Sequence, residues 1–275
     1  MITLFKTLST LPLWLLHAVG WGLGWLVFAV SGVYRQRFLA NARQAGMAGR
    51  QWRGAVGASG QLVTELPRLW LGRPVPVQWD GAAHVEAALA LGRGVLFLTP
   101  HLGCFEITAQ AYAQRYGQAQ PMTVLFRPPR QRWLEEVVST ARARPGLHTA
   151  PTTLAGVKQM IKALKKGQSL GLLPDQVPPL GMGVWATFFG RDAYTMTLSV
   201  RLAQQTGATV LMAWGERLCW GRGYRVHVQP LPAPLPADGA QAVQLINAAL
   251  ESLIRNCPQQ YLWGYARYKQ PRQEV

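Results

Sequence analysis

The stretch Gly94-Val-Leu-Phe-Leu-Thr-Pro100-His101-Leu-Gly-Cys-Phe-Glu106 indicates how this chain folds. It begins with an apolar run of strand length, bounded by Gly94 and Pro100, which is typical of a buried strand. The residues that follow, 107–113, have a helical pattern. We therefore expect His101 in a turn at the carboxyl end of the strand, where open α/β sheets place their ligands.

The spacing of His101 and Glu106 adds a chemical prediction. Residues five positions apart on one helix point about 140° away from each other, so the two side chains could not meet there. With His101 in the turn and Glu106 in the first turns of the helix, the chain can fold back and bring the carboxylate to the imidazole. That contact would fix the tautomer and leave the other ring nitrogen free to take a proton. We predict His101 and Glu106 as a general-base pair.

Strand-like and helix-like stretches alternate over most of the chain. This alternation predicts an α/β fold with a largely parallel sheet flanked by helices. Residues 80–91 are expected to form a short amphipathic helix, after an extended connector over 74–80. The expected strands are 94–99, 122–126, 169–173, 208–214 and 224–229. The expected helices between them are 104–116, 131–143, 153–166, 197–206 and 239–256.

The N-terminal stretch 11–33 is almost uncharged and long enough to cross a hydrocarbon core of about 30 Å as a helix. Five arginines follow between residues 35 and 53, which argues against a cleaved signal peptide and places the body of the protein in the cytoplasm. We expect an uncleaved anchor, either spanning or lying in the interface. The expected organisation is a membrane anchor over 1–33, a helical connector over 34–80 and a catalytic domain over 81–275.

The composition favours an anionic lipid partner. The formal net charge is +16, the hydrophobic content is 49% and there are 11 Trp residues. Nucleic acid, an anionic lipid surface and an acidic carrier protein all attract such a chain, but no nucleic-acid recognition motif is present and the basic residues are scattered. Trp favours membrane interfaces, so lipid is the better interpretation and nucleic acid is not expected. Three widely spaced Cys residues indicate a reducing compartment.

The segment Thr99–Glu106 resembles the signature of the lipid A biosynthesis acyltransferases of the lauroyl and myristoyl type. These are membrane enzymes of Gram-negative bacteria whose motif is similar to that of the glycerolphosphate acyltransferases. Further blocks match in the same order, so the resemblance covers nearly the whole chain. At the family's Trp-x-His-Arg-Arg position, however, Tyr265 and Ala266 replace the His and the first Arg. The matching blocks are 126–128, 163–167, 173–176, 188–190, 202–208 and 260–263.

The resemblance implies both fold and chemistry. It implies a glycerolphosphate acyltransferase-like fold and an O-acyltransferase of lipopolysaccharide biosynthesis on the cytoplasmic face of the cell inner membrane. Its donor would be an acyl carrier protein thioester and its acceptor a hydroxyl of a lipid A precursor. No cofactor is expected, and direct transfer from a thioester needs no covalent enzyme intermediate.

Three further residues are candidates for substrate binding. Arg127 follows a strand and would hold a phosphate or the developing oxyanion, a role that the family's Arg-Pro motif favours over a solvated arginine. Asp175 and Gln176 follow Pro174 at the end of another strand, where they either cap a loop or line the acceptor site. The five His residues lack metal-ligand spacing, so no metal is expected. Cys104 is interpreted as a small packed side chain rather than as a nucleophile.

Two other functions stay open at this point. A glycerophospholipid acyltransferase would use the same base, although that relative usually has Asp where Glu106 stands. A non-catalytic lipid-binding protein of the membrane surface would have no use for the His-Glu pair. The polar motif residues fall at expected strand ends, which favours an enzyme.

Overall fold

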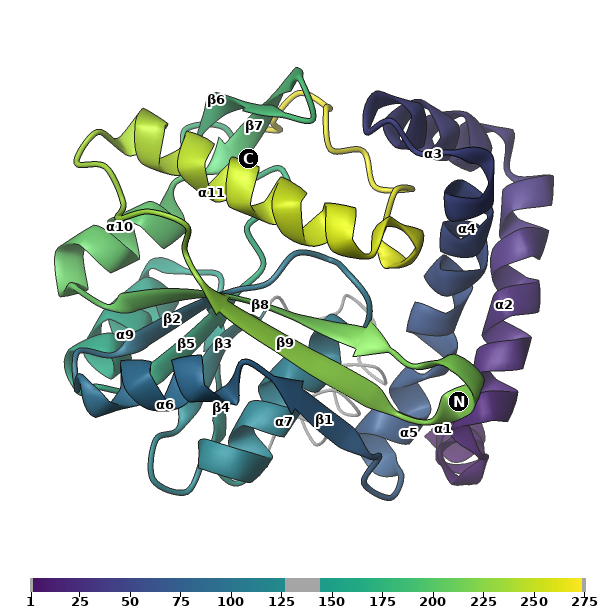
Figure 1. Cartoon of the computed structure of the whole chain (residues 1–275), viewed down its shortest axis with the longest axis horizontal. Coiled ribbons are helices and arrows are strands. Elements are labelled where there is room, and N and C mark those ends of the chain that lie inside the picture. Colours follow the sequence, from purple (N-terminus) through teal and green to yellow (C-terminus); the bar gives the residue numbers. More distant parts are fainter. Residues whose placement is uncertain (1, 127–143, 274–275) are drawn as a thin grey trace.

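The computed structural model describes residues 2–126 and 144–273. The expected helix 131–143 and Arg127 lie outside the described residues. The centre of the molecule is a seven-stranded sheet in the order β1-β9-β8-β2-β5-β3-β4, flanked by helices (Figure 1). Its strands are β1 (Val77–Asp80), β2 (Val95–Leu98), β3 (Met122–Phe126), β4 (Leu147–Pro151), β5 (Ser169–Leu172), β8 (Thr209–Arg217) and β9 (Tyr224–Pro230).

The sheet is largely parallel, which confirms the predicted fold class. Strands β2, β3, β4, β5 and β8 all run in one direction. Strand β9 runs antiparallel to β8, and β1 pairs with β9 in parallel, so these two strands at one end of the sheet run the other way. The carboxyl ends of five strands therefore meet at one edge, where polar side chains from different strands come together.

Alternation along β2 divides the core into two layers. Leu96 and Leu98 pack on one face of the sheet with α9 (Leu154–Lys165), α10 (Leu198–Thr206) and α11 (Gly239–Asn256). Val95 and Phe97 pack on the other face with α6 (Ala82–Ala90) and α7 (Phe105–Tyr116). All four strand residues are buried, which explains why the sequence shows an apolar run rather than an alternating one.

All five expected strands are present, but four further strands were missed. The stretch expected as a connector over 74–80 ends in β1, and β4 lies at the opposite edge of the sheet. Strands β6 (Gly183–Phe188) and β7 (Arg191–Met196) form a separate antiparallel hairpin. Helix α11 stabilises this hairpin, because the side chains of Gln244 and Asn247 both donate hydrogen bonds to the carbonyl of Thr187 in β6.

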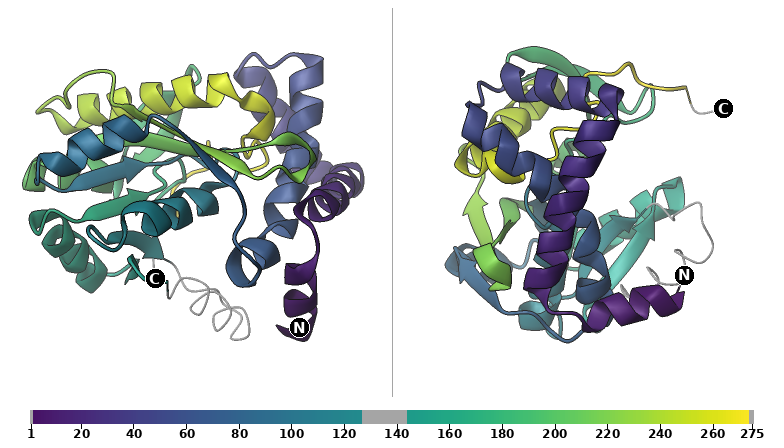
Figure 2. Two further views of the ribbon diagram at one scale, coloured as in Figure 1. Left: turned by 60° about the horizontal axis from the view of Figure 1, so that its bottom comes forward. Right: turned by 90° about the vertical axis from the view of Figure 1, so that its right-hand side faces the viewer.

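The N-terminal part of the chain forms a layer of helices beside the sheet. The apolar stretch breaks at Pro12, which separates α1 (Ile2–Thr10) from α2 (Leu13–Val30). The next helices are α3 (Gly32–Gln44), α4 (Gly49–Thr64) and α5 (Leu66–Leu71). Figure 1 shows α4 and α2 beyond the end of β8, and Figure 2 shows α2 running along the outside of this layer. The helical layer therefore stands at the carboxyl edge of the five parallel strands.

Candidate active site

His101 lies in the turn between β2 and α7, as the sequence predicts. Three backbone hydrogen bonds from distant segments hold this turn: Gly103 N to Gln260 O at 2.9 Å, Cys104 N to Gly215 O at 2.8 Å, and Leu262 N to His101 O at 3.1 Å. Gly103 has a φ of +61°, and a Cβ at this position would overlap the carbonyl oxygen of Gly215. The close approach of the two backbones therefore requires glycine here.

The structure places Asp175 and Gln176 on the two ring nitrogens of His101. Asp175 follows β5, the neighbour of β2, and its Oδ1 lies 2.7 Å from His101 Nδ1. The amide nitrogen of Gln176 lies 3.0 Å from His101 Nε2. A carboxylate at Nδ1 keeps the proton on that nitrogen, so Nε2 is the acceptor and Gln176 donates to it. The arrangement leaves Nε2 as the basic atom of the ring.

Asp175 is buried and fully engaged. Its Oδ2 accepts hydrogen bonds from the backbone N–H of His101 at 2.9 Å and from the hydroxyl of Tyr261 at 3.1 Å. Burial by itself would raise the pKa of this carboxyl, but the charge and hydrogen bonds of His101 and the charge of Arg267 hold the pKa below its usual value. Asp175 therefore stays ionised and can stabilise a protonated His101.

The expected contact between Glu106 and the His101 ring is replaced by the contact with Asp175. Glu106 lies in the first turn of α7 and is buried, and its Oε2 accepts a hydrogen bond from Trp70 Nε1 at 3.3 Å. The chain from His101 to Glu106 runs away from the imidazole into α7. Strand β5, in contrast, pairs with β2 and ends beside it, so the residues after β5 lie next to His101. Strand pairing, which spacing alone does not reveal, therefore supplies the carboxylate for the ring.

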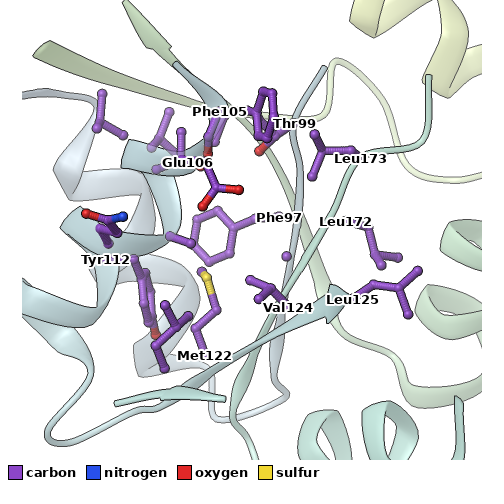
Figure 3. A pocket seen from close by; sticks show the side chains of 18 of the residues that line it. Phe97, Thr99, Phe105, Glu106, Tyr112, Met122, Val124, Leu125, Leu172 and Leu173 are labelled. Carbon is purple, nitrogen blue, oxygen red and sulfur yellow. The ribbon is translucent and has the colours of Figure 1, made fainter. Parts of the chain in front are cut away.

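Glu106 instead faces an apolar pocket between α7 and the sheet. Figure 3 shows its carboxylate directed into this pocket above Phe97, with Thr99 nearby. The pocket is open to solvent at its mouth and has a cavity volume of about 70 Å³. Gly171 of β5 lies between Phe97 and Val124 in the same row across the sheet, so the absent side chain contributes to the space. Carboxylate and apolar cavity together fit a ligand with a polar end and a hydrocarbon body.

Behind the His101 turn lies a buried cluster that the sequence did not indicate. Arg217 donates to Glu65, and its Nη2 also donates to the carbonyl of Gly103 at 3.2 Å. His17 Nε2 lies 3.0 Å from Glu65 Oε2, and the hydroxyl of Tyr224 donates to the same oxygen at 2.8 Å. The only signal in the sequence was polar residues inside otherwise apolar stretches, and nothing there showed that they meet.

Cys104 is packed beneath the turn, as expected. Its side chain is fully buried, and burial raises the pKa of its thiol well above the usual value. A thiol held in its protonated form is a poor nucleophile. Among the described residues, no group of three or more His, Cys, Asp or Glu side chains is arranged to hold a metal ion.

This geometry can be compared with known proteins. The profile of the bacterial lipid A biosynthesis acyltransferases matches residues 68–270, well over half of the chain. The chain belongs to this family. The resemblance seen in its motifs is thereby confirmed, and the match contains His101, Glu106, Arg127, Asp175 and Gln176 but neither His17 nor Glu65.

Several characterised relatives are similar over most of this chain. The palmitoleoyltransferase of lipid A biosynthesis from Escherichia coli K12 is 28% identical over 191 residues, which is 69% of this chain and 60% of the relative. The lauroyltransferase of the same organism is 26% identical over 215 residues, 76% of this chain and 68% of the relative. The myristoyltransferase is 27% identical over 192 residues, 68% of this chain and 57% of the relative. The chain thus spans less than two thirds of the length of the first and third of these relatives.

Proposed function

We propose that this protein transfers a fatty acyl chain from an acyl carrier protein thioester to a hydroxyl of a lipid A precursor, late in lipopolysaccharide biosynthesis. Membership of the family supports the reaction class. The observation that carries the proposal is the His101 ring at the carboxyl edge of the sheet, with Asp175 at Nδ1 and an accepting Nε2. This is the equipment of a general base beside an apolar pocket.

In the proposed reaction the acceptor hydroxyl takes the place of the Gln176 amide at His101 Nε2. Nε2 removes the hydroxyl proton while the oxygen forms a bond to the thioester carbonyl carbon. The tetrahedral intermediate then collapses, the carbon–sulfur bond breaks, and the imidazolium returns its proton to the leaving thiolate. Asp175 stabilises the imidazolium between these steps. Arg127 remains the proposed partner of a phosphate or of the oxyanion.

We propose that Glu106 contributes to substrate binding and does not orient the His101 ring. Its carboxylate points into the pocket from the helix that begins directly after the His101 turn. We propose that it accepts a hydrogen bond from the acceptor and so aligns the hydroxyl toward Nε2. Trp70, which donates to Glu106, holds the carboxylate in this orientation.

The apolar pocket is the proposed site of the acyl chain. Its lining is largely aliphatic and aromatic and extends from Thr99 down to Met122 and Leu147. A hydrocarbon chain gains about 0.8 kcal/mol for each buried CH₂ group, so an apolar pocket favours an acyl donor whose chain it can bury. The net charge of +16 suits both substrates, since the carrier protein is acidic and the acceptor is phosphorylated. We place the reaction on the cytoplasmic face of the inner membrane.

The test is an assay of the purified protein with acyl carrier protein thioester and a lipid A precursor that has a free hydroxyl, followed by mass spectrometry of the lipid. His101→Ala and Glu106→Ala should each abolish the acylated product. His84→Ala changes an exposed histidine on α6 and should retain full activity. Full activity of His101→Ala would reject the mechanism. Product formed with lysophosphatidate, and none with the lipid A precursor, would reject the acceptor.

A further inference from the structure

Helix α2 is docked along its whole length. Its buried residues follow one stripe from the first turn to the last: Leu13, Leu16, His17, Gly20, Gly24 and Phe28. This stripe packs on α4, and glycines bring the two backbones together. A Cβ at Gly60 would overlap the carbonyl oxygen of Gly20, and a Cβ at Gly24 would overlap that of Val56. The two helices are therefore in direct backbone contact at these glycines.

Polar contacts strengthen this docking. The hydroxyl of Thr64 donates to the carbonyl of Leu16 at 2.7 Å, and Gln61 Nε2 donates to the carbonyl of His17 at 3.3 Å. The His17 ring also meets the buried carboxylate of Glu65. Removing α2 from α4 would leave this carboxylate short of a partner in the interior, which is costly.

The opposite face of α2 is apolar and exposed. Val19, Leu23, Leu26 and Val30 are exposed at helical spacing, and the helix contains no Asp, Glu, Lys or Arg. Among the described residues, α2 is the one helix long and apolar enough to cross a membrane. A continuous apolar face of this size on the surface of a protein marks an interaction site.

The β8–β9 hairpin extends this apolar face. Its tip carries Trp220, which is 88% exposed, and the tip packs against the start of α2, where a Cβ at Gly221 would overlap Trp14 N. Trp220 also has a φ of +58°, a left-handed conformation that a bulky residue adopts at a cost of about 1–2 kcal/mol. Two neighbouring exposed tryptophans, one of them in a strained conformation, indicate a partner into which aromatic side chains can insert.

The docking to α4 decides how α2 can meet a bilayer. An 18-residue helix is about 27 Å long, enough to cross a hydrocarbon core of about 30 Å. While docked, however, α2 could cross only if α4 crossed beside it. Helix α4 has 16 residues and is about 24 Å long, which is short of that core, and its Ala55 and Val56 are packed into the interior of the protein.

We propose that α2 stays docked on α4 and lies in the plane of an anionic membrane, with its outer face and Trp220 inserted into the interfacial region. An anionic bilayer fits this surface because basic residues border the uncharged helix at both ends: Lys6 before it, and Arg35 and Arg37 after it. Because α2 and α4 stand at the carboxyl edge of the sheet, the membrane lies on the side of His101. The proposal concerns attachment and is independent of the acyl transfer.

Cys219 offers a direct probe of insertion. It is exposed next to Trp220, whereas Cys104 and Cys257 are buried, so an environment-sensitive dye can be attached to the native protein at this one site. Vesicles of phosphatidylglycerol should shift the dye emission to the blue, and phosphatidylcholine vesicles should do so less. Trp220→Ser should weaken vesicle binding several-fold, while Trp185→Ser, a half-exposed tryptophan of the β6–β7 hairpin, should leave it unchanged. A blue shift that depends on protein concentration without vesicles would show that a second copy covers the face, and would overturn the proposal.

Substitutions at two glycines of α2 distinguish a helix docked on α4 from a free transmembrane helix. Gly24→Leu places a side chain against α4 and should lower the thermal midpoint and disrupt attachment. Gly22→Leu adds the same side chain where nothing lies within 4 Å and should be tolerated. Equal tolerance of both variants would contradict docking, because a free transmembrane helix accepts leucine on any face.

Accessibility of the two helix ends gives an independent readout that does not require a destabilised variant. In a Cys219→Ser background, a cysteine is placed before α2 by Thr10→Cys or after it by Val33→Cys, both at exposed positions. With the protein bound to sealed vesicles, a membrane-impermeant maleimide added outside should label both positions. Protection of one end until the vesicles are lysed would show that the helix spans, and the proposal would fail.

Discussion

Arg217 and Glu65 form a buried ion pair directly behind the turn that carries His101. Arg217 donates from Nε to Glu65 Oε2 at 2.7 Å and from Nη2 to Oε1 at 2.6 Å. The same Nη2 reaches the carbonyl of Gly103, two residues after His101. Because His17 of α2 contacts Glu65 as well, one carboxylate joins the N-terminal helical layer, the end of β8 and the turn that carries the proposed base.

Glu65→Gln should destabilise the fold strongly. The substitution leaves the Arg217 charge buried without its counter-ion, and breaking such a pair costs about 3–5 kcal/mol. Urea unfolding followed by far-UV circular dichroism measures this loss. The matched control is Glu86→Gln, because Glu86 forms an exposed ion pair with Arg115 at 3.0 Å and should lose no more than about 1 kcal/mol. Equal losses in the two variants would contradict the importance of the buried pair.

The same carboxyl predicts how stability depends on pH. Burial alone would raise the pKa of Glu65, but the charge and hydrogen bonds of Arg217, with a smaller contribution from His17, lower it from 4.5 to about 2. A carboxyl whose pKa is lower in the folded state than in the unfolded state stabilises the fold fully at pH values above its unfolded-state pKa. That contribution is lost as the pH falls from about 4.5 toward about 2. The free energy of unfolding should therefore fall over this window, and Glu65→Gln should fall less steeply.

Asp175→Asn should reduce the turnover number by on the order of 10³–10⁴ while the protein remains folded. An amide can donate to His101 Nδ1 and so favour the wrong tautomer, and it does not stabilise the imidazolium. Steady-state kinetics and circular dichroism measure the two quantities. Asp192→Asn, at an exposed position of β7, makes the same chemical change away from the site and should leave turnover intact. An unchanged turnover in Asp175→Asn would exclude Asp175 as the orienting carboxylate.

Gly171→Val should shift the preferred acyl donor toward shorter chains. A Cβ at Gly171 already lies 3.2 Å from Val124 Cγ1 and 3.6 Å from Met122 Sδ, so the larger side chain fills part of the pocket. Competition among donors of different chain length, read by mass spectrometry of the product, measures the shift. Gly239→Val, where a Cβ meets nothing within 4 Å, is the matched control. If both variants retain the original chain length, the acyl chain does not occupy this pocket.

Alkylation should distinguish the three cysteines. In the folded protein a thiol reagent should modify Cys219 alone, since Cys104 and Cys257 are buried and burial raises the pKa of both thiols, that of Cys257 to about 12. Intact-mass measurement should show one modification, and three in denaturant. Cys104→Ala should retain activity, because the proposed reaction uses no thiol of the enzyme. Loss of activity with an unchanged fold would return Cys104 to consideration as a nucleophile.

Sequence patterns predicted the elements that depend on local properties. The run before Pro100 predicted β2, and the four other apolar runs predicted β3, β5, β8 and β9. Strand β1 was missed because it is only four residues long and follows Pro74 and Pro76, which are typical of an extended connector. Strands β6 and β7 were missed because much of their support comes from polar side chains of α11, which lies more than 40 residues later in the chain.

The same division applies to the site. The sequence by itself determined that a histidine follows the first buried strand of the catalytic region, and that Asp175 and Gln176 end another strand. Only the tertiary structure decided which carboxylate reaches the imidazole, because β5 pairs with β2 and brings Asp175 to Nδ1, while α7 turns Glu106 into the pocket. Local sequence sets where a strand ends and which polar residue stands there. Hydrogen bonding between strands, which joins residues 74 positions apart, sets which of those residues touch.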